Sequence, residues 1–373
     1  MKEKIEEINL YHVRIPMTEP FKISNGEVSI KDSIIIQVKF KSGLISYGEA
    51  SPMSGSFYSE ETPESVWNEL INKVSLIKTE FDFANFKNEI SNLLRRLSQL
   101  KLSSYAIAGI ETALWDAYSK ILGKPIYNLL GANYKEIESG LAVGIYNNVN
   151  DLLKKIEGYL KTGNYKRVKI KIQKNWDIEP ISNIRKFFGN IPLMVDANCA
   201  YDRNDIEHLK KLDDFELMMI EQPLPKDDLI GHGVLQTRIS TPICLDESAD
   251  SIQNLKIAFS FNSCKIVNIK IQRVGGLLNA KRMHDFCKEN NIPVWVGTMP
   301  ELGIGAFHAL SLCMLDNCKF PTDIESSLRW YIDDIIEPVV EVKNGKVIFN
   351  QNTFVNLEKI QKYSLNKVKI KFN

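Results

Sequence analysis

Three carboxylates in the middle of this 373-residue chain each follow a short apolar run. Asp196 ends the run LMVD, Glu221 ends LMMIE, and Asp246 ends ICLD. The first two acids are 25 residues apart, and so are the last two. A strand, a helix and two connecting loops fill such a period, so the spacing predicts successive βα units.

Carboxylates at equivalent strand ends meet in one place when the strands close into a parallel barrel. All the strand ends share one rim, and the C-terminal rim is where such barrels carry their chemistry. Three converging carboxylates repel one another, and their hard oxygen atoms are ligands that Mg²⁺ prefers. We therefore expect Asp196, Glu221 and Asp246 to bind Mg²⁺, for which Mn²⁺ can substitute.

Lysine side chains are expected on both sides of this rim. The run RVKIKI, residues 167–172, alternates cationic and branched residues, so Lys169 and Lys171 share one face of a strand. If the branched face packs on the helices, the lysines point into the barrel. Lys270 ends the run IVNIK, 24 residues after Asp246. Its strand is about four positions from that of Lys171, which places the two amines on opposite sides of an eight-stranded barrel.

This combination suits the removal of a proton from the carbon next to a carboxylate. That proton is very weakly acidic, and its loss leaves two negative charges on the carboxylate oxygens, which a bound cation stabilises. A lysine that is shielded from water and close to other cations has a lowered pKa, so it can act as the base. The residues therefore predict an enzyme that forms an enolate from a small carboxylate substrate.

The elements that position these residues follow from the hydrophobic pattern. Residues 1–130 predict an α+β unit, with a hairpin at 34–49, loops at 17–26 and 50–61, and a helix at 103–122. From residue 139 strands alternate with helices, which is typical of a parallel barrel. Strands are expected at 140–143, 167–172, 193–195, 217–220, 243–245, 266–269 and 294–296, and helices at 149–161, 179–188, 203–211, 229–238, 251–259, 278–288 and 303–314. The Asn344-Gly345 pair predicts a last hairpin at 340–349, and we expect this terminal β segment to pack on the N-terminal sheet.

Composition excludes several other classes of protein. The net charge is +1, so neither nucleic acid nor a membrane is an expected partner, and no apolar run reaches the ~20 residues of a membrane-spanning helix. The N-terminus lacks the apolar core of a signal peptide, and the six cysteines form no CxxC pair. We therefore expect a cytoplasmic protein with reduced thiols. The five histidines end no strand, and structural roles are expected for them.

The motifs resemble those of the enolase superfamily, in its muconate-lactonizing subgroup. KIK at 169–171, VDAN at 195–198, IEQP at 220–223, LDES at 245–248 and NIK at 268–270 occur in that family's order and at its spacing. The similarity is closest to the o-succinylbenzoate synthase and N-acylamino acid racemase family, through KIKIQKNWDIEPI, TPICLDES, IVNIKIQRVGG and IPVWVGTM. The resemblance implies an α/β fold with a modified TIM barrel, (β/α)₇β, at residues 131–325. It implies an α+β capping domain built from residues 1–130 and the C-terminal segment 326–373.

The resemblance also implies roles for individual residues. The family's metal ligands fall on Asp196, Glu221 and Asp246, and its acid/base lysines fall on Lys171 and Lys270. In the expected reaction, Lys171 removes the proton and Lys270 stabilises the enolate from the other face.

Loops and neighbouring residues complete the site that the resemblance implies. The family's two mobile loops fall near residues 17–26 and 51–60, which implies that Tyr58 lines the substrate. The family also implies a homo-oligomer. Other residues expected at the substrate or directly behind the ligands are Lys169, Asn198, Thr298, Met299 and Glu301.

Several positions depart from the family's pattern. The run GTMPELG, residues 297–303, stands where the family typically has GGM-E-[ST]-G, and Ile271-Gln272 replaces its usual Pro-Gly. Ala306 stands where the family often has Arg. These positions border the substrate, so Thr298, Leu302 and Ala306 leave the identity of the physiological carboxylate open.

The expected reaction is a Mg²⁺-dependent syn-dehydration of a succinyl-hydroxy-cyclohexadiene carboxylate to o-succinylbenzoate, a step of menaquinone synthesis. The alternative is racemisation of N-acylamino acids with both lysines as bases, and the sequence does not separate the two. A dipeptide epimerase is less expected because residues 297–303 lack the Asp-x-Asp motif of that group; a muconate cycloisomerase-like enzyme is also less expected. The non-enzyme alternative is an inactive barrel with a binding role, against which the intact acids and lysines argue.

Overall fold

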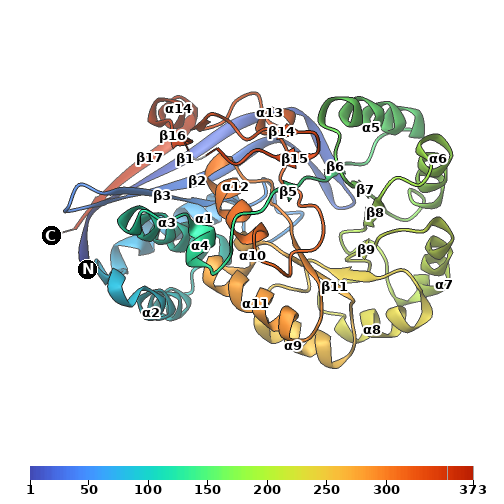
Figure 1. Ribbon diagram of the computed structural model, residues 1–373, viewed down its shortest axis with the longest axis horizontal. Helices are drawn as coiled ribbons and strands as arrows, with labels where there is room; N and C mark the ends of the chain where they lie inside the picture. Colours follow the sequence, from blue (N-terminus) through green and yellow to red (C-terminus); the bar gives the residue numbers. More distant parts are fainter. Residues whose placement is uncertain (351, 373) are drawn as a thin grey trace.

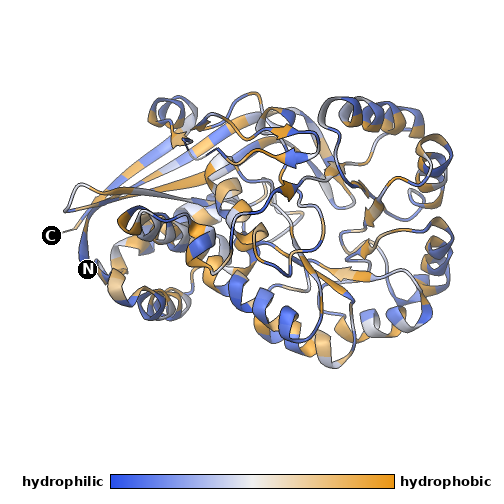
Figure 2. Cartoon of the chain, in the orientation of Figure 1, coloured by the Kyte–Doolittle hydropathy of each residue, from blue (hydrophilic) through white to orange (hydrophobic). Residues whose placement is uncertain are grey.

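The computed structural model describes residues 1–350 and 352–372. An antiparallel sheet, to which both ends of the chain contribute, lies beside a ring of parallel strands from the middle of the chain (Figure 1). Figure 2 shows apolar residues in the strands of both sheets, whereas the helices carry apolar and polar stripes. Among the described residues, no helix is long and apolar enough to cross a membrane.

Long strands form the N-terminal unit, because residues 1–50 are rich in β-branched residues that favour a pleated sheet. These strands are β1 (Lys2–Ile23), β2 (Gly26–Phe40) and β3 (Ile45–Ala50), with β4 (Glu80–Asp82) paired to the start of β1 and β17 (Ser364–Lys371) paired to its outer side. The order is β17-β1-β2-β3. The predicted hairpin at 34–49 is confirmed by the pairing of β2 with β3. The prediction of a loop over 17–26 is wrong, because β1 and β2 extend through it to a two-residue turn.

Helices α1 (Pro63–Lys73), α2 (Phe86–Gln99) and α3 (Ser104–Leu122) accompany this sheet, followed by the short α4 (Ile126–Leu129). Two glycines allow α3 to pack closely on β3. A Cβ atom at Gly48 would lie 2.0 Å from the carbonyl oxygen of Gly109, and one at Gly109 would lie 2.5 Å from Ile36. Gly48 therefore accepts no side chain without movement of the helix, and a side chain at Gly109 would require Ile36 and Ala50 to shift.

Seven parallel strands form the second sheet, in sequential order from β6 to β12. They are β6 (Leu141–Val143), β7 (Val168–Lys171), β8 (Leu193–Asp196), β9 (Ile220–Glu221), β10 (Ile243–Leu245), β11 (Ile266–Ile269) and β12 (Val294–Val296). The helices around them are α5 (Val149–Gly163), α6 (Ile178–Phe188), α7 (Ile206–Leu209), α8 (Leu229–Arg238), α9 (Ile252–Ser260), α10 (Ile271–Val274), α11 (Leu277–Glu289) and α12 (Gly303–Cys313).

An irregular eighth strand closes the ring. Cys318 bridges to Val294 of β12, and Thr322 bridges to Ser139 just before β6, both in parallel orientation. The Thr322 amide donates to Glu138 at 2.9 Å, and the Gly140 amide donates to Thr322 at 2.8 Å. This stretch supplies the strand that the alternating pattern of the sequence lacks.

Period-two alternation divides the barrel interior into an apolar floor and a charged mouth. The floor is a buried cluster of Met194, Met219, Cys244, Ile266 and Trp295. Two residues after each of the first three of these comes an acid, on the same face of its strand. The alternation that packs the floor therefore also directs the acids toward the C-terminal rim.

Two further sequence predictions are corrected. The helix expected at 203–211 is broken into a 3₁₀ turn (Arg203–Asp205), the single turn α7 and a second 3₁₀ segment (Lys210–Phe215). The hairpin at 340–349 exists as β14 (Val342–Lys343) and β15 (Lys346–Val347), but β15 pairs with β5 (Ile137–Glu138) and not with the N-terminal sheet. It is β17 that joins that sheet. The remaining C-terminal elements are α13 (Ser327–Trp330), β13 (Ile336–Glu337), β16 (Phe354–Val355) and α14 (Leu357–Tyr363).

Substitution of Gly48 by alanine should destabilise the fold. The added methyl group would overlap the α3 backbone, so we expect Gly48→Ala to lower the free energy of unfolding by at least about 2 kcal/mol, measured by urea denaturation. Gly158, on the exposed side of α5 with open space around it, is the control. Gly158→Ala should raise the free energy by about 0.5–1 kcal/mol through helix propensity. Equal effects of the two substitutions would contradict the close approach.

Candidate active site

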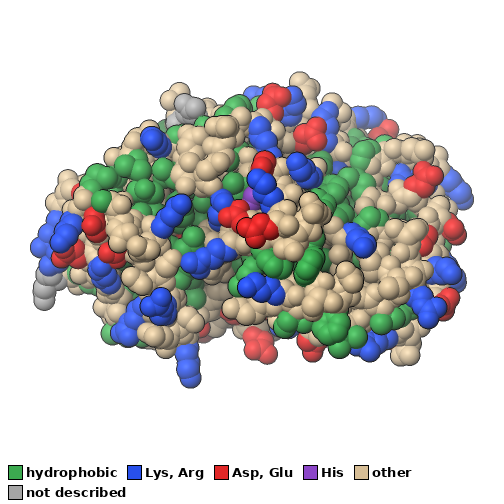
Figure 3. All heavy atoms as spheres, turned by 60° about the horizontal axis from the view of Figure 1, so that its bottom comes forward, with side chains coloured by type: hydrophobic (Ala, Val, Ile, Leu, Met, Phe, Trp, Pro, Cys, Tyr) green, Lys and Arg blue, Asp and Glu red, His purple; other side chains and the backbone are tan. Residues whose placement is uncertain are grey.

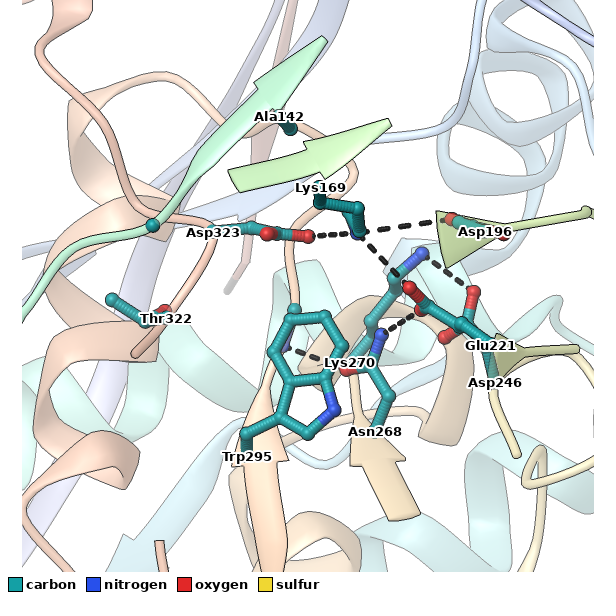
Figure 4. A network of polar contacts seen from close by, with 12 residues as sticks. Ala142, Lys169, Asp196, Glu221, Asp246, Asn268, Lys270, Trp295, Thr322 and Asp323 are labelled. Carbon is teal, nitrogen blue, oxygen red and sulfur yellow. Dashed lines mark hydrogen bonds and ion pairs between the residues drawn. The ribbon is translucent and has the colours of Figure 1, made fainter. Parts of the chain in front are cut away.

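Six charged side chains from five consecutive strands meet at the C-terminal rim of the barrel. Figure 4 labels all of them except Lys171. Each is less than one-tenth exposed to solvent. Charges so buried need partners of opposite sign or a bound ion. They are Lys169 and Lys171 of β7, Asp196 of β8, Glu221 of β9, Asp246 directly after β10 and Lys270 directly after β11.

Lys169 lies at the centre of this group. Its ammonium is 3.2 Å from Glu221 and 3.7 Å from Asp196, and it donates a further short hydrogen bond to Asp323 of the closing strand (Figure 4). The ring of Trp295 lies below it, 4.9 Å from the ammonium. Burial opposes its charge, but these carboxylates outweigh burial and raise the pKa of Lys169. One cation thus bridges two of the three predicted metal ligands.

Lys171 is held in a different way. Its ammonium donates to Asp196 at 2.5 Å and to the side-chain oxygen of Asn198 at 2.7 Å. Asn198 is itself fixed, because its amide nitrogen donates to Glu247 at 2.8 Å and its backbone amide donates to Asp196 at 3.0 Å. Asn198, which is expected behind the ligands, thus contacts Lys171, Asp196 and Glu247.

Lys270 approaches from the opposite side of the ring. Three strands separate β7 from β11 in one direction, and β12, the closing strand and β6 separate them in the other. The Lys270 ammonium is 2.9 Å from Asp246 and 3.3 Å from the hydroxyl of Tyr58. The guanidinium of Arg273, one helical turn later, binds the other oxygen of Asp246 at 2.5 Å.

The electrostatics of the rim differ from the prediction in one respect. A lowered pKa is expected for the base lysines, but the pKa of Lys270 is raised: burial and Arg273 favour the neutral amine, and Asp246 and Glu221 outweigh them. Burial, followed by the neighbouring Asp196, raises the pKa of Glu221 to about 8, against the effect of Lys169. For Asp246, burial favours protonation, but Arg273 and Lys270 reverse the balance and hold its pKa below the usual range.

No three carboxylate, imidazole or thiol side chains are already arranged around one point as metal ligands, within residues 1–350 and 352–372. The three acids are bound to cations of the chain instead. The donor set nevertheless fits Mg²⁺ in its chemistry: three buried carboxylates at neighbouring strand ends, close enough that Asp196 and Asp246 both raise the pKa of Glu221. A divalent cation would relieve that repulsion.

A cavity lies between the two catalytic-lysine candidates, Lys171 and Lys270. Its walls come from the barrel, from the end of β1 and the loop after β3 in the N-terminal unit, and from the C-terminal segment. Tyr58 and Thr298, which are expected at the substrate, both line it. The other lining residues are Phe21, Ile23, Met53, Ala142, Lys169, Pro300, Asp323 and Trp330.

The tip of the β1–β2 hairpin reaches the barrel mouth beside β8. The Ser24 hydroxyl donates to the carbonyl oxygen of Ala197 at 3.1 Å, and the Asn25 side chain donates to that of Asn198 at 3.1 Å. Phe21 packs edge-on against Trp330, with ring centroids 5.0 Å apart. The hairpin therefore forms one wall of the cavity.

Other predicted residues lie outside this cavity. Met299 is buried and accepts a hydrogen bond from Tyr105 at 3.8 Å. Glu301 is 8% exposed and lies beside a separate small cavity that it shares with Thr298 and Ala306. Its Oε2 has no hydrogen-bond partner among the residues that the structure describes. Leu302 is fully buried. Of the residues expected after the last predicted strand, the structure therefore brings Thr298 to the lysines and keeps Met299 and Glu301 behind it.

Three residues of the rim are absent from the sequence prediction. Asn268 donates to Glu221 at 2.7 Å. The sequence pattern that could have indicated it is the period of two along the strand, which places Asn268 on the same face as Lys270. Arg273 follows Lys270 by one helical turn. Asp323 binds Arg167 at 2.9 Å as well as Lys169, but the irregular strand that carries it has no period to detect.

The chain is similar to known proteins over both parts of the fold. The N-terminal domain of the mandelate racemase / muconate lactonizing enzyme family matches residues 5–131, and the family described as enolase C-terminal domain-like matches residues 151–353. Over 348 residues the chain is 42% identical to o-succinylbenzoate synthase of Geobacillus kaustophilus, covering 93% of this chain and 91% of that protein. It is 36% identical to N-succinylamino acid racemase of Amycolatopsis sp over 340 residues, 90% of each chain.

A solved structure shows the same architecture. A member of the enolase superfamily from Listeria innocua matches with a TM-score of 0.90 and 33% identity, covering 100% of both chains. The predicted fold, a modified TIM barrel with an α+β capping domain, is confirmed.

Removal of Asp323 should destabilise the fold more than removal of an exposed ion-pair partner. Asp323→Asn leaves the buried cations Arg167 and Lys169 with one carboxylate fewer, so we expect the free energy of unfolding to fall by about 3 kcal/mol. Glu157→Gln, at the exposed pair with Lys161, is the control and should cost less than about 0.5 kcal/mol. Urea denaturation measures both. A near-neutral Asp323→Asn would contradict the charge balance described above.

Proposed function

Because this chain belongs to the mandelate racemase / muconate lactonizing enzyme family of the enolase superfamily, in the group of o-succinylbenzoate synthases and N-succinylamino acid racemases, we propose that it is an o-succinylbenzoate synthase. The proposed reaction is the Mg²⁺-dependent syn-dehydration of a succinyl-hydroxy-cyclohexadiene carboxylate, through an enolate, in menaquinone synthesis. The observation that carries it is a cavity lined by two buried amines, Lys171 and Lys270, whose strands stand on either side of the three strands that carry the buried acids.

Lys171 is the proposed base. Asp196 and Asn198 hold its amine toward the cavity, so the neutral amine can take the proton from the carbon next to the substrate carboxylate. In a syn elimination the hydroxyl group leaves from the same face. The Lys171 ammonium can then return the proton to the departing oxygen, which leaves as water.

Lys270 is the proposed stabiliser of the enolate. Its amine reaches the cavity from the side opposite Lys171, where an ammonium would stabilise the developing negative charge from the second face. Tyr58 and Asp246 orient it.

Asp196, Glu221 and Asp246 are the proposed Mg²⁺ ligands. When bound there, Mg²⁺ would offset the charge of the three acids and stabilise negative charge on the substrate carboxylate. Lys169 and Asn268 would keep Glu221 in place.

Racemisation of N-succinylamino acids is a second candidate. The specific observation in its favour is that both amines reach one cavity from opposite sides, as a reaction that removes a proton from one face and delivers it to the other requires. The 36% identity to N-succinylamino acid racemase of Amycolatopsis sp also favours it. The two reactions share the first step, so one protein can perform both.

The partners and location follow the same proposal. A small carboxylate is the proposed partner, and homo-oligomerisation and a cytoplasmic location stay predictions.

Lys and Arg side chains are interspersed with Asp and Glu on the described part of the face shown in Figure 3.

Substitution of either lysine should abolish turnover. With the cyclohexadiene substrate and Mg²⁺, we expect Lys171→Ala and Lys270→Ala to lower kcat by about 10²–10⁴-fold, because each removes a group that acts on the reacting carbon or its charge. Lys174→Ala is the control, since Lys174 is half-exposed and pairs with Asp202 and Asp205. It should retain wild-type kcat. A wild-type protein inert toward both this substrate and N-succinylamino acids would refute the proposal.

Removal of divalent metal should abolish activity reversibly. Treatment with EDTA should abolish dehydration, and Mg²⁺ or Mn²⁺ should restore it. Calorimetric titration with Mg²⁺ should show binding to the wild type and to Asp250→Asn, whose side chain binds Asn254, but not to Asp246→Asn. Undiminished activity in EDTA, or Mg²⁺ binding to Asp246→Asn at wild-type affinity, would show that the ligand assignment is wrong.

A further inference from the structure

The loop between β12 and α12, residues 297–302, forms part of the substrate cavity but is held from outside the barrel. Thr298 and Pro300 line the cavity. The ammonium of Lys31, from β2, donates to the carbonyl oxygen of Met299 at 3.3 Å, and the hydroxyl of Tyr331 donates to that of Pro300 at 2.9 Å. Both partners are buried and belong to the capping sheet or the C-terminal segment.

Glu49 makes the central contact to this loop. It lies on β3, is fully buried, and accepts hydrogen bonds from the backbone amides of Leu302 and Gly305, each at 2.8 Å. The Ser33 hydroxyl donates to the same carboxylate at 2.8 Å and fixes its orientation. A carboxylate at the start of a helix satisfies amides that lack partners in the helix and interacts favourably with its dipole.

Helix α12 depends on this outside partner. Its own N-cap residue, Leu302, has no side chain that can accept a hydrogen bond. A Cβ atom at Gly305 would lie 3.0 Å from the Glu49 carboxylate and 2.7 Å from the Cβ of Glu301. The glycine thus leaves space for the carboxylate to reach the helix, and the loop ends where Glu49 binds it.

We propose that Glu49 is a positioning residue for the reaction, which acts through the loop 297–302 and sets where Thr298 and Pro300 meet the substrate. The expected change in KM rests on the proposed function, whereas the expected change in the loop does not. Glu49 belongs to the capping sheet, but the cavity wall that it fixes is the loop 297–302 of the barrel.

Glu111 provides a matched control. It is also a fully buried carboxylate of the capping unit, on α3, and it accepts hydrogen bonds from the amides of Leu277 and Leu278 at the start of α11, at 2.8 and 2.9 Å. Burial raises the pKa of Glu49 and of Glu111 to about 7. The two carboxylates hold different parts of the barrel. Glu49 holds the end of a loop that lines the cavity, whereas Glu111 holds the start of α11, which α10 and two glycines separate from Lys270.

The kinetic experiment compares Glu49→Gln with Glu111→Gln. An amide in place of the carboxylate leaves one backbone amide of α12 facing a second donor. We expect Glu49→Gln to raise KM by about tenfold, since displacement of Thr298 and Pro300 weakens the positioning of the substrate. Ser33→Ala, which leaves the carboxylate in place, should raise KM less and in the same direction. Glu111→Gln should lose stability but keep KM within about twofold, because a lower folded fraction changes kcat and not KM.

Backbone hydrogen–deuterium exchange of the full-length chain tests the same inference without turnover. Glu49→Gln should speed exchange in the segment 299–305 by at least about tenfold, and Glu111→Gln should speed it in the segment 277–280 instead. Unchanged exchange at 299–305, or an equal KM for Glu49→Gln and the wild type, would overturn the proposal. A wild type inert toward both substrates would refute the proposed function alone, and the exchange result would still decide the role of Glu49.

Discussion

Charge compensation away from water is the constraint on which the barrel mouth depends. Three carboxylates and three ammonium groups lie less than one-tenth exposed, and Arg167, Arg273 and Asp323 extend the set. None of these charges could stay ionised alone at such burial.

The barrel does not complete this site by itself. The hairpin tip of the N-terminal sheet supplies Phe21 and Ile23, the next loop supplies Tyr58, and the C-terminal segment supplies Trp330. Buried carboxylates on the capping side cap two barrel helices. Buried charges are thus gathered at the strand ends of the barrel, while residues from distant parts of the chain together shape the cavity.

Regular repetition explains what could be predicted from the sequence. The 25-residue spacing puts Asp196, Glu221 and Asp246 at the ends of neighbouring strands, and the alternation in RVKIKI puts Lys169 and Lys171 on one face of β7. Irregular segments were missed for the same reason. Asp323 lies on a strand held by isolated bridges, and the 203–211 region breaks into 3₁₀ turns. The raised pKa of Lys270 depends on distances to Asp246 and Glu221, which no sequence pattern contains.

The pairing of β17 with β1 has a consequence for biosynthesis. The 22-residue β1 is synthesised long before its outer neighbour, which comes from residues 364–371. While the ribosome extends the nascent chain, one long side of β1 has no strand beside it, and such open edges recruit other chains. Folding of the N-terminal sheet during translation therefore carries an aggregation hazard that ends only when the last strand docks.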